Sequence, residues 1–203
     1  MRLTARLRTS LRSFKSVLDR GVYRRVLYAI PQIERLALLY TDAESSGQIA
    51  AVLVAGGVTR YWIAKVPRSL AKRLHFRYTQ IVPFELIAAI MGILVFDPLV
   101  GLNTRLLHFI DAKAALNIVL KGASRQEDLN SLISVLWLTL CEKQATYWAF
   151  HVQSAANLAD GPSGGKLDIM KALSATEVVA EMPEVASALD QFYAPCLPEH
   201  FMW

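Results

Sequence analysis

Four acidic residues stand where a folded chain can bring them together to bind a metal ion. Asp42 ends the apolar run LALLYTD, and Asp111 ends the apolar run LLHFID. Glu85 lies in the first turn of a predicted helix, and Asp160 lies in a loop after a predicted strand. A carboxylate at the end of a buried strand costs free energy unless it is solvated, paired or bound to a metal. Taken alone, Asp42 also fits a strand that emerges into solvent and begins a turn.

Alternating and continuous apolar runs predict the strands that position these acids. The predicted strands cover residues 35–42, 48–56, 58–67, 103–110 and 145–152. The first three are joined by short turns, of which Gly56-Gly57 is the clearest signal, and this spacing predicts an antiparallel meander. The first and fourth strands can then lie side by side in the centre of the sheet, so that Asp42 and Asp111 become neighbours.

Three helices and a closing segment complete the predicted order of elements. The predicted helices cover residues 83–97, 112–122 and 125–144, and a helical tail begins near Leu167. The helix at 83–97 is apolar nearly all round, which indicates that it packs against a sheet. From that position it can present Glu85 to the strand ends that carry Asp42 and Asp111.

A cluster of carboxylates predicts a divalent cation. Neighbouring carboxylates repel one another and raise one another's pKa unless a cation lies between them. Oxygen ligands favour Mg²⁺ or Mn²⁺ over Zn²⁺. Two such ions about 3.5–4 Å apart can activate a water and stabilise the leaving oxygen in phosphodiester cleavage.

Four stretches resemble the ribonuclease H domain of retroelement reverse transcriptase polyproteins, including the tyrosine-recombinase (DIRS-like) and LTR-retrotransposon types. They are LLYTDAESSG, FELIAAIMGIL, HFIDAKAALNIVLKGASR and HVQSAANLADGPSG, and the similarity covers roughly residues 35–166. The last stretch matches the family's closing pattern through His151, Asn157, Asp160 and Pro162-Ser163. Gly164 stands where the family has an arginine, and Glu44 adds an acid after the first aspartate.

The resemblance implies an α/β ribonuclease H-like fold: a five-stranded mixed sheet, with a three-strand antiparallel meander, two parallel strands and helices on both faces. It implies that two Mg²⁺ or Mn²⁺ ions are held by Asp42, Glu85, Asp111 and Asp160. It also implies that His151 or Ser154, at the start of the last loop, supports the metal site. His151 either shuttles a proton or serves as a capping or packing residue, and Asn157 braces the loop through its side-chain amide.

Basic residues indicate where nucleic acid would bind. The predicted nucleic-acid contacts are Arg68, Lys72, Arg73, Arg77 and Arg125. The first four belong to a connector at 68–80 that either contacts phosphates or forms a solvated face. Ser124 and Arg125 are expected to be a helix cap and its first turn.

The net charge of +5 comes from the N-terminal segment. Residues 1–25 contain eight Arg or Lys and one acid, whereas the rest is mildly acidic. Leu3, Leu7, Leu11, Phe14 and Leu18 recur at steps of three and four, which predicts an amphipathic basic helix over residues 1–20. Such a helix suits docking on the body, a nucleic-acid arm or a transit peptide. We therefore expect three parts: a basic helical arm at 1–30, the ribonuclease H-like domain at 31–166, and a helical tail at 167–203.

The remaining composition sets expectations about location. Two cysteines are too few for a disulfide framework, and the longest apolar run, at 86–96, is too short to span a bilayer. We expect a soluble protein without a membrane partner, cytoplasmic or nuclear, with a mitochondrial location left open by the basic helix.

Three functional hypotheses follow. The first is an endonuclease that cleaves the RNA strand of RNA–DNA hybrids, detached from its reverse transcriptase polymerase, since 203 residues leave no room for one. The second is a 3′–5′ exonuclease that uses Asp42 and Glu44 as an Asp-x-Glu pair, although His151 lies nine residues before Asp160 where those enzymes place a His four or five before. The third is a catalytically degenerate module that binds nucleic acid or a polymerase partner.

Overall fold

The computed structural model describes residue 15 and residues 35–97, 99–101 and 104–180 of the 203-residue chain. The predicted basic arm at 1–30 lies outside the described residues except for Lys15, and so do residues 181–203 of the predicted tail. Among the described residues, no helix is long and apolar enough to cross a membrane.

The described residues form a mixed sheet in the order β5-β4-β1-β2-β3-β6. The strands are β1 (Arg35–Ala43), β2 (Gln48–Ala55), β3 (Val58–Lys65), β4 (Thr104–Ile110), β5 (Thr146–His151) and β6 (Thr176–Glu177). β1, β2 and β3 form the predicted antiparallel meander, and β1, β4 and β5 pair in parallel. The predicted α/β class and mixed sheet are confirmed, with six strands rather than five.

The sixth strand comes from the predicted helical tail. β6 pairs in parallel with β3, and the Val178 backbone N–H donates to the Tyr61 carbonyl oxygen. The Trp62 indole N–H then donates to the Ala180 carbonyl oxygen at 3.0 Å. A two-residue strand has no periodicity, so the sequence pattern could not reveal it.

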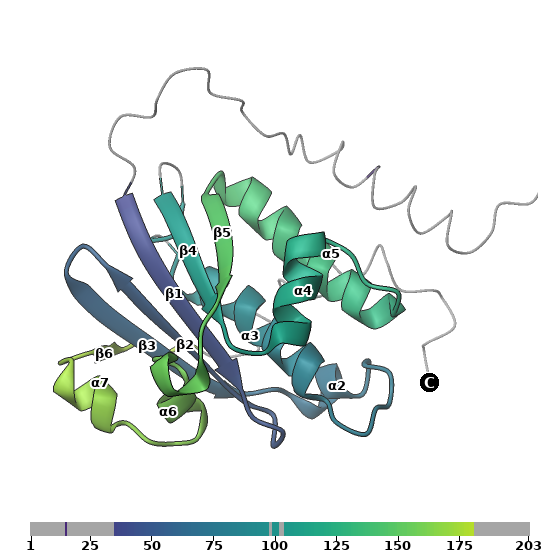
Figure 1. Cartoon of the computed structure of the whole chain (residues 1–203), viewed down its shortest axis with the longest axis horizontal. Helices are drawn as coiled ribbons and strands as arrows, with labels where there is room; N and C mark the ends of the chain where they lie inside the picture. The colour runs from purple at the N-terminus through teal and green to yellow at the C-terminus, as the bar shows by residue number, and fades with distance from the viewer. Residues whose placement is uncertain (1–14, 16–34, 98, 102–103, 181–203) are drawn as a thin grey trace, which may run out of the picture.

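Helices cover both faces of the sheet (Figure 1). They are α2 (Arg68–Ala71), α3 (Ile81–Val95), α4 (Lys113–Lys121), α5 (Glu127–Lys143), the 3₁₀ turn η1 (Ser154–Ala156), α6 (Asp160–Ser163) and α7 (Asp168–Ala172). α3 lies against β1 and β2, with α4 and α5 beside it, and α6 packs on the opposite face of β1 and β2. Helices on both faces are thus confirmed, although the short α2 and α6 lie in segments predicted as a connector and a loop.

Helix α3 packs closely on the sheet. Residues of α3 from Pro83 to Ile93 are all buried. A Cβ added at Gly92 would lie 3.1 Å from side-chain atoms of Leu39, Ala51 and Thr41. Since that distance is tighter than ordinary contact, glycine lets the helix lie directly on β1 and β2. Helix α3 begins at Ile81, two residues before the predicted start, so Glu85 lies in its second turn rather than its first, beside the carboxyl end of β1.

The capping prediction at α5 needs a correction. Helix α5 begins at Glu127, with Gln126 as its N-cap residue, so Arg125 precedes the helix rather than lying in its first turn. Ser124 Oγ accepts a hydrogen bond from the Gln126 backbone N–H. The serine therefore closes a turn before the helix and does not cap it.

Candidate metal centre

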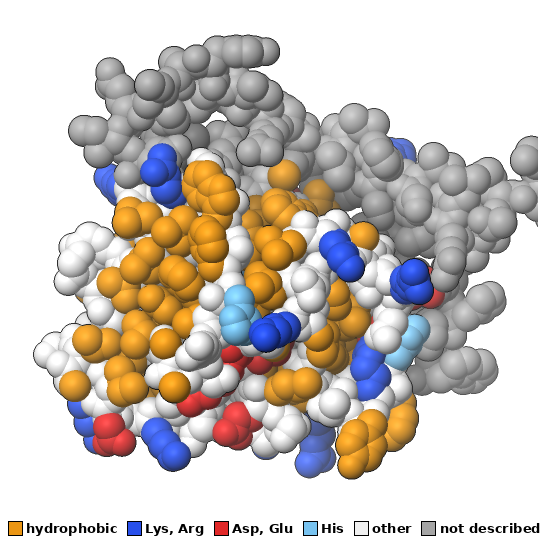
Figure 2. Space-filling model, viewed as in Figure 1, with side chains coloured by type: hydrophobic (Ala, Val, Ile, Leu, Met, Phe, Trp, Pro, Cys, Tyr) orange, Lys and Arg blue, Asp and Glu red, His pale blue; other side chains and the backbone are white. Residues whose placement is uncertain are grey.

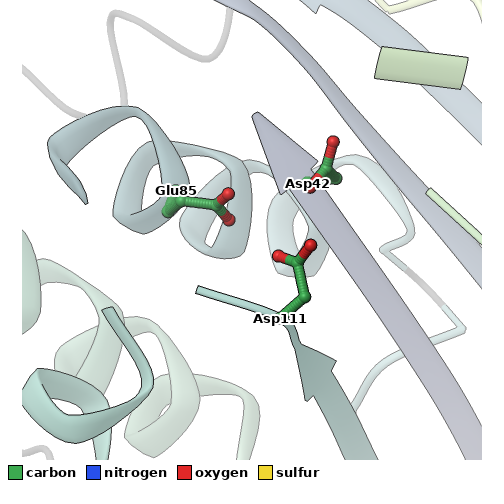
Figure 3. Close-up of side chains that lie close together, drawn as sticks. All are labelled: Asp42, Glu85 and Asp111. Atoms are coloured by element: carbon green, nitrogen blue, oxygen red, sulfur yellow. The ribbon is translucent and has the colours of Figure 1, made fainter. Parts of the chain in front are cut away.

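Three carboxylates from three separate elements meet at the carboxyl end of the central strands. Asp42 lies near the end of β1, Asp111 directly follows β4, and Glu85 lies in α3 (Figure 3). One oxygen from each lies within 4.8 Å of the other two. Because Thr41 pairs with Ile110 in parallel register, the two aspartates occupy equivalent positions one residue further on. The predicted approach of these three residues is thus present in the structure.

Glu85 is the most deeply buried of the three. It is 2% exposed, and its Oε1 accepts a hydrogen bond from the Ala43 backbone N–H at 3.3 Å. Its Oε2 is buried without a hydrogen-bond partner. Burial, reinforced by Asp42 and Asp111, raises the pKa of Glu85 to about 9. A buried carboxylate oxygen without a partner is costly and requires a specific explanation.

Asp42 is buried too, but its surroundings partly stabilise its charge. Burial raises its pKa to about 6, and the charges of Asp111 and Asp160 act in the same direction. Ser163 Oγ donates a hydrogen bond to Asp42 Oδ2 and opposes that shift. Asp42 therefore ionises more readily than Glu85.

Asp111 is half-buried and faces the last loop. Ser154 Oγ donates a hydrogen bond to Asp111 Oδ2 at 2.7 Å. Of the two residues predicted to support the site at this loop, Ser154 makes the contact with the acidic cluster. His151 is exposed at the end of β5 and does not line the cleft beside the cluster.

The three carboxylates line a cavity of about 480 Å³. Asp160, the first residue of α6, also lines this cavity and is exposed. It lies outside the group of three, although its charge acts on Asp42. The four predicted acids therefore share one cleft, with three in a tight group and Asp160 at the rim.

Two further charged residues line the cleft: Glu44, which only the exonuclease hypothesis used, and Lys166, which the sequence analysis did not single out. Both are exposed. A Cβ added at Gly164 would lie 3.2 Å from Glu44 Oε1. The two departures from the family pattern are thus neighbours in space. Lys166 follows the last motif by only a few residues, and this proximity is the signal that could have identified it.

The donor set fits a hard divalent cation. It consists of carboxylate oxygens, which Mg²⁺ and Mn²⁺ prefer. A cation would satisfy the unpartnered Glu85 Oε2 and offset both the burial and the mutual repulsion that raise the two pKa values. Asp42, Glu85 and Asp111 are the residues that would hold it, with Asp160 able to complete a second position.

A buried polar chain supports the strands behind the cleft. Thr41 Oγ1 lies 2.7 Å from His108 Nε2, and His108 Nδ1 lies 2.8 Å from the Tyr147 hydroxyl oxygen. Burial lowers the pKa of His108 to about 3, so the ring is neutral and links a neighbour on each side. Asn157 Nδ2 donates to the Thr41 carbonyl oxygen at 3.0 Å, which is the bracing contact that the sequence predicted. The chain ties β1, β4, β5 and the last loop together.

The predicted nucleic-acid contacts differ in their surroundings. Arg68, Lys72 and Arg125 are exposed. Arg77 instead donates to Asp128 Oδ1 at 2.5 Å and, through Nε, to Gln126 Oε1 at 2.8 Å. Burial would raise the pKa of Asp128, but the hydrogen bonds from Arg77 and the His75 backbone N–H outweigh it and hold the pKa below its usual value. The Arg77 guanidinium therefore anchors the connector to α5.

No protein-family model matches the sequence, and no curated protein matches it. Among solved structures, ribonuclease H1 from the halophilic archaeon Halobacterium salinarum is 14% identical, with a TM-score of 0.46 over 66% of this chain and 98% of that one. RuvC from T. thermophilus, in complex with a Holliday junction substrate, is 13% identical, with a TM-score of 0.31 over 78% and 94%. NurA bound to dAMP and manganese is 13% identical, with a TM-score of 0.24 over 53% and 25%. At these identities the likeness concerns the fold, and the chemistry of the site rests on the residues described above.

Proposed function

We propose that this chain is a metal-dependent nuclease that cleaves phosphodiester bonds at the acidic cleft. The observation that carries the proposal is the convergence of Asp42, Glu85 and Asp111 within 4.8 Å, with one buried Glu85 oxygen left without a partner. Such an arrangement is unfavourable without a cation and suits a pair of Mg²⁺ or Mn²⁺ ions, which supply charge neutralisation and water activation in phosphodiester cleavage.

Each residue of the cleft has a role in this proposal. Asp42 and Asp111 hold the cations from the ends of adjacent strands, and Glu85 fixes one of them from α3. Ser163 keeps Asp42 oriented by donating to Oδ2, and Ser154 does the same for Asp111. Asp160 at the rim completes the acidic set, where solvent and substrate have access.

The proposed substrate is an RNA–DNA hybrid, and the proposed origin is a retroelement reverse transcriptase polyprotein with a polymerase partner. Both rest on the four motif stretches within residues 35–166. The exposed Arg68 and Lys72 lie in and after α2, in the connector that leads into α3, and they are suitable phosphate contacts.

The test is cleavage of an end-labelled RNA–DNA hybrid by the full chain, with Mg²⁺ or Mn²⁺ and with chelator. Asp111→Asn should abolish cutting of the RNA strand. Asp168→Asn, which changes an exposed aspartate outside the cleft, should leave it intact. Equal cleavage by wild type and Asp111→Asn would contradict the proposal.

A catalytically degenerate binding module is the second candidate, because Glu44 adds a further carboxylate to the cleft beside Gly164. Hybrid binding by wild type without turnover in either metal would favour this candidate. The exonuclease hypothesis has less support, since His151 does not line the cleft.

A further inference from the structure

One face of the sheet carries an apolar surface that no helix in the described part of the chain covers. We call it the outer sheet face; it comprises Leu36, Leu38, Tyr40, Leu107, Phe109, Trp148 and Phe150. In the parallel register of β1, β4 and β5, Leu107 pairs with both Leu38 and Trp148, while Phe109 pairs with both Tyr40 and Phe150. Paired residues of parallel strands project to the same side, so these side chains form rows across three strands.

The side chains of this face contact one another and remain accessible. Tyr40 and Phe109 stack with ring centroids 4.8 Å apart, and Phe109 lies 5.9 Å from Phe150. Leu36 is 52% exposed, Trp148 42% and Phe150 44%. Figure 2 shows hydrophobic side chains gathered over this part of the sheet. A contiguous exposed patch of this kind marks an interaction surface rather than scattered surface residues.

The helices on the same side of the sheet cover a different part of it. Ala159 and Met170, from the region of α6 and α7, bury Ala50, Val52 and Tyr61 of β2 and β3. Tyr40 packs at the border of this cluster. The described helices therefore leave the area over β4, β5 and the first half of β1 accessible.

We propose that residues 1–20 of this chain dock on the outer sheet face as an amphipathic helix. Their apolar stripe, with Leu7 and Leu11 near its centre, is a sequence feature that the cleft does not explain. A helix of 20 residues is about 30 Å long, and a seven-residue strand spans about 23 Å, so the helix can cross the whole face. Residues 21–34 join it to β1 at Arg35, directly beside Leu36, and 14 residues can span up to about 45 Å.

The position of the other chain end favours this occupant over the C-terminal segment. Ala180 accepts a hydrogen bond from Trp62, which is 1% exposed in the core on the α3 side of the sheet. The chain therefore leaves the described region beside β3 and on the opposite face. The N-terminal segment enters at β1, which is itself part of the outer sheet face.

Docking would also determine where the basic side chains of residues 1–20 lie. With its leucines on the sheet, the helix turns arginines toward solvent beside β1 and β4, whose carboxyl ends form the cleft. An effect of these arginines on nucleic-acid binding rests on the proposed function. The docking of the helix on the sheet does not.

The test compares two variants of the full chain that add equal charge to opposite sides of the predicted helix. Leu7→Glu with Leu11→Glu disrupts the stripe, whereas Thr9→Glu with Ser16→Glu changes the polar side. Hydroxyl-radical footprinting with mass spectrometry then reports the modification of Trp148 and Phe150. We expect protection in wild type and in the polar-side variant, and at least a threefold increase in the stripe variant. Phe76, which is 96% exposed and outside the face, serves as the internal reference.

A second measurement changes the outer sheet face instead of the N-terminal segment. Trp148→Glu with Phe150→Glu changes exposed positions, so the core should remain folded. This double variant should increase the rate of trypsin cleavage at Arg8 and Arg12 about tenfold. Equal footprints in wild type and both arm variants would overturn the proposal. Protection of Trp148 and Phe150 that grows with protein concentration would overturn it and would indicate that a second copy of the chain covers the face. Neither readout depends on hydrolysis of a hybrid, so the docking can fail while the proposed function holds.

Discussion

Replacement of Glu85 by glutamine tests whether the acidic cluster is built for a cation. In the metal-free folded chain the pKa of Glu85 is about 9, against 4.5 for an unperturbed glutamate. At pH 7 the side chain is therefore protonated when folded and ionised when unfolded. Folding must take up a proton at a pH about 2.5 units above the unfolded pKa, which costs roughly 3 kcal/mol at about 1.4 kcal/mol per unit.

Glutamine has the same shape and needs no proton, so Glu85→Gln should stabilise the metal-free protein. The sign follows from the raised pKa: the folded state binds more protons, and the contribution of Glu85 to stability falls as pH rises from about 4.5 toward 9. The gain from Glu85→Gln should therefore be near zero at pH 4 and about 2–3 kcal/mol at pH 7. Urea unfolding in chelator at several pH values measures it.

Metal should narrow this difference. At a Mg²⁺ or Mn²⁺ concentration ten times the dissociation constant, wild type should gain about 1.4 kcal/mol, and Glu85→Gln much less. Glu127→Gln, at an exposed position in α5, should stay within about 0.5 kcal/mol of wild type under both conditions. A metal-free Glu85→Gln that is less stable than wild type at pH 7, or a difference that does not vary with pH, would refute the reasoning.

Three further substitutions test the surroundings of the site. Arg77→Ala should cost about 2 kcal/mol because it leaves the buried Asp128 carboxylate without its guanidinium partner. Chemical denaturation, with the exposed Arg68→Ala as control, measures the difference. Tyr147→Phe should cost about 1–2 kcal/mol because His108 Nδ1 loses its hydrogen bond; the exposed Tyr78→Phe should have no effect in the same assay. Ser163→Ala removes the bond that lowers the pKa of Asp42, so the acidic limb of the pH–rate profile of cleavage should move to higher pH. An unchanged profile would show that Asp42 does not titrate in that limb.

The sequence predicts the central part of the site well because burial makes its acids conspicuous. Asp42 and Asp111 end apolar strands, where an unpaired charge is costly. Their register follows once β1 and β4 pair in parallel. Glu85 stands out as the polar exception in an apolar helix. Close packing of α3 on the sheet at Gly92 then brings the helix near the strands that carry the two aspartates.

Other features depend on contacts that leave no local pattern. Arg77 looks like the other basic residues of the connector, and only its bond to Asp128, 51 residues away, distinguishes it. Lys166 is an ordinary charged residue until the loops bring it to the cleft. The two-residue β6 is too short to be detected by periodicity.

The apolar composition of the strands supports the proposal that the outer sheet face is covered. Strands that alternate apolar and polar residues have one face in water, whereas strands buried on both faces are apolar almost throughout. β1 is apolar at every position from Leu36 to Tyr40, and β5 contains the run from Tyr147 to Phe150. Helices α3, α4 and α5 account for only one of their two faces. The sequence of the sheet thus favours a second cover over β1, β4 and β5, and the amphipathic stripe of residues 1–20 has the length and composition to provide it.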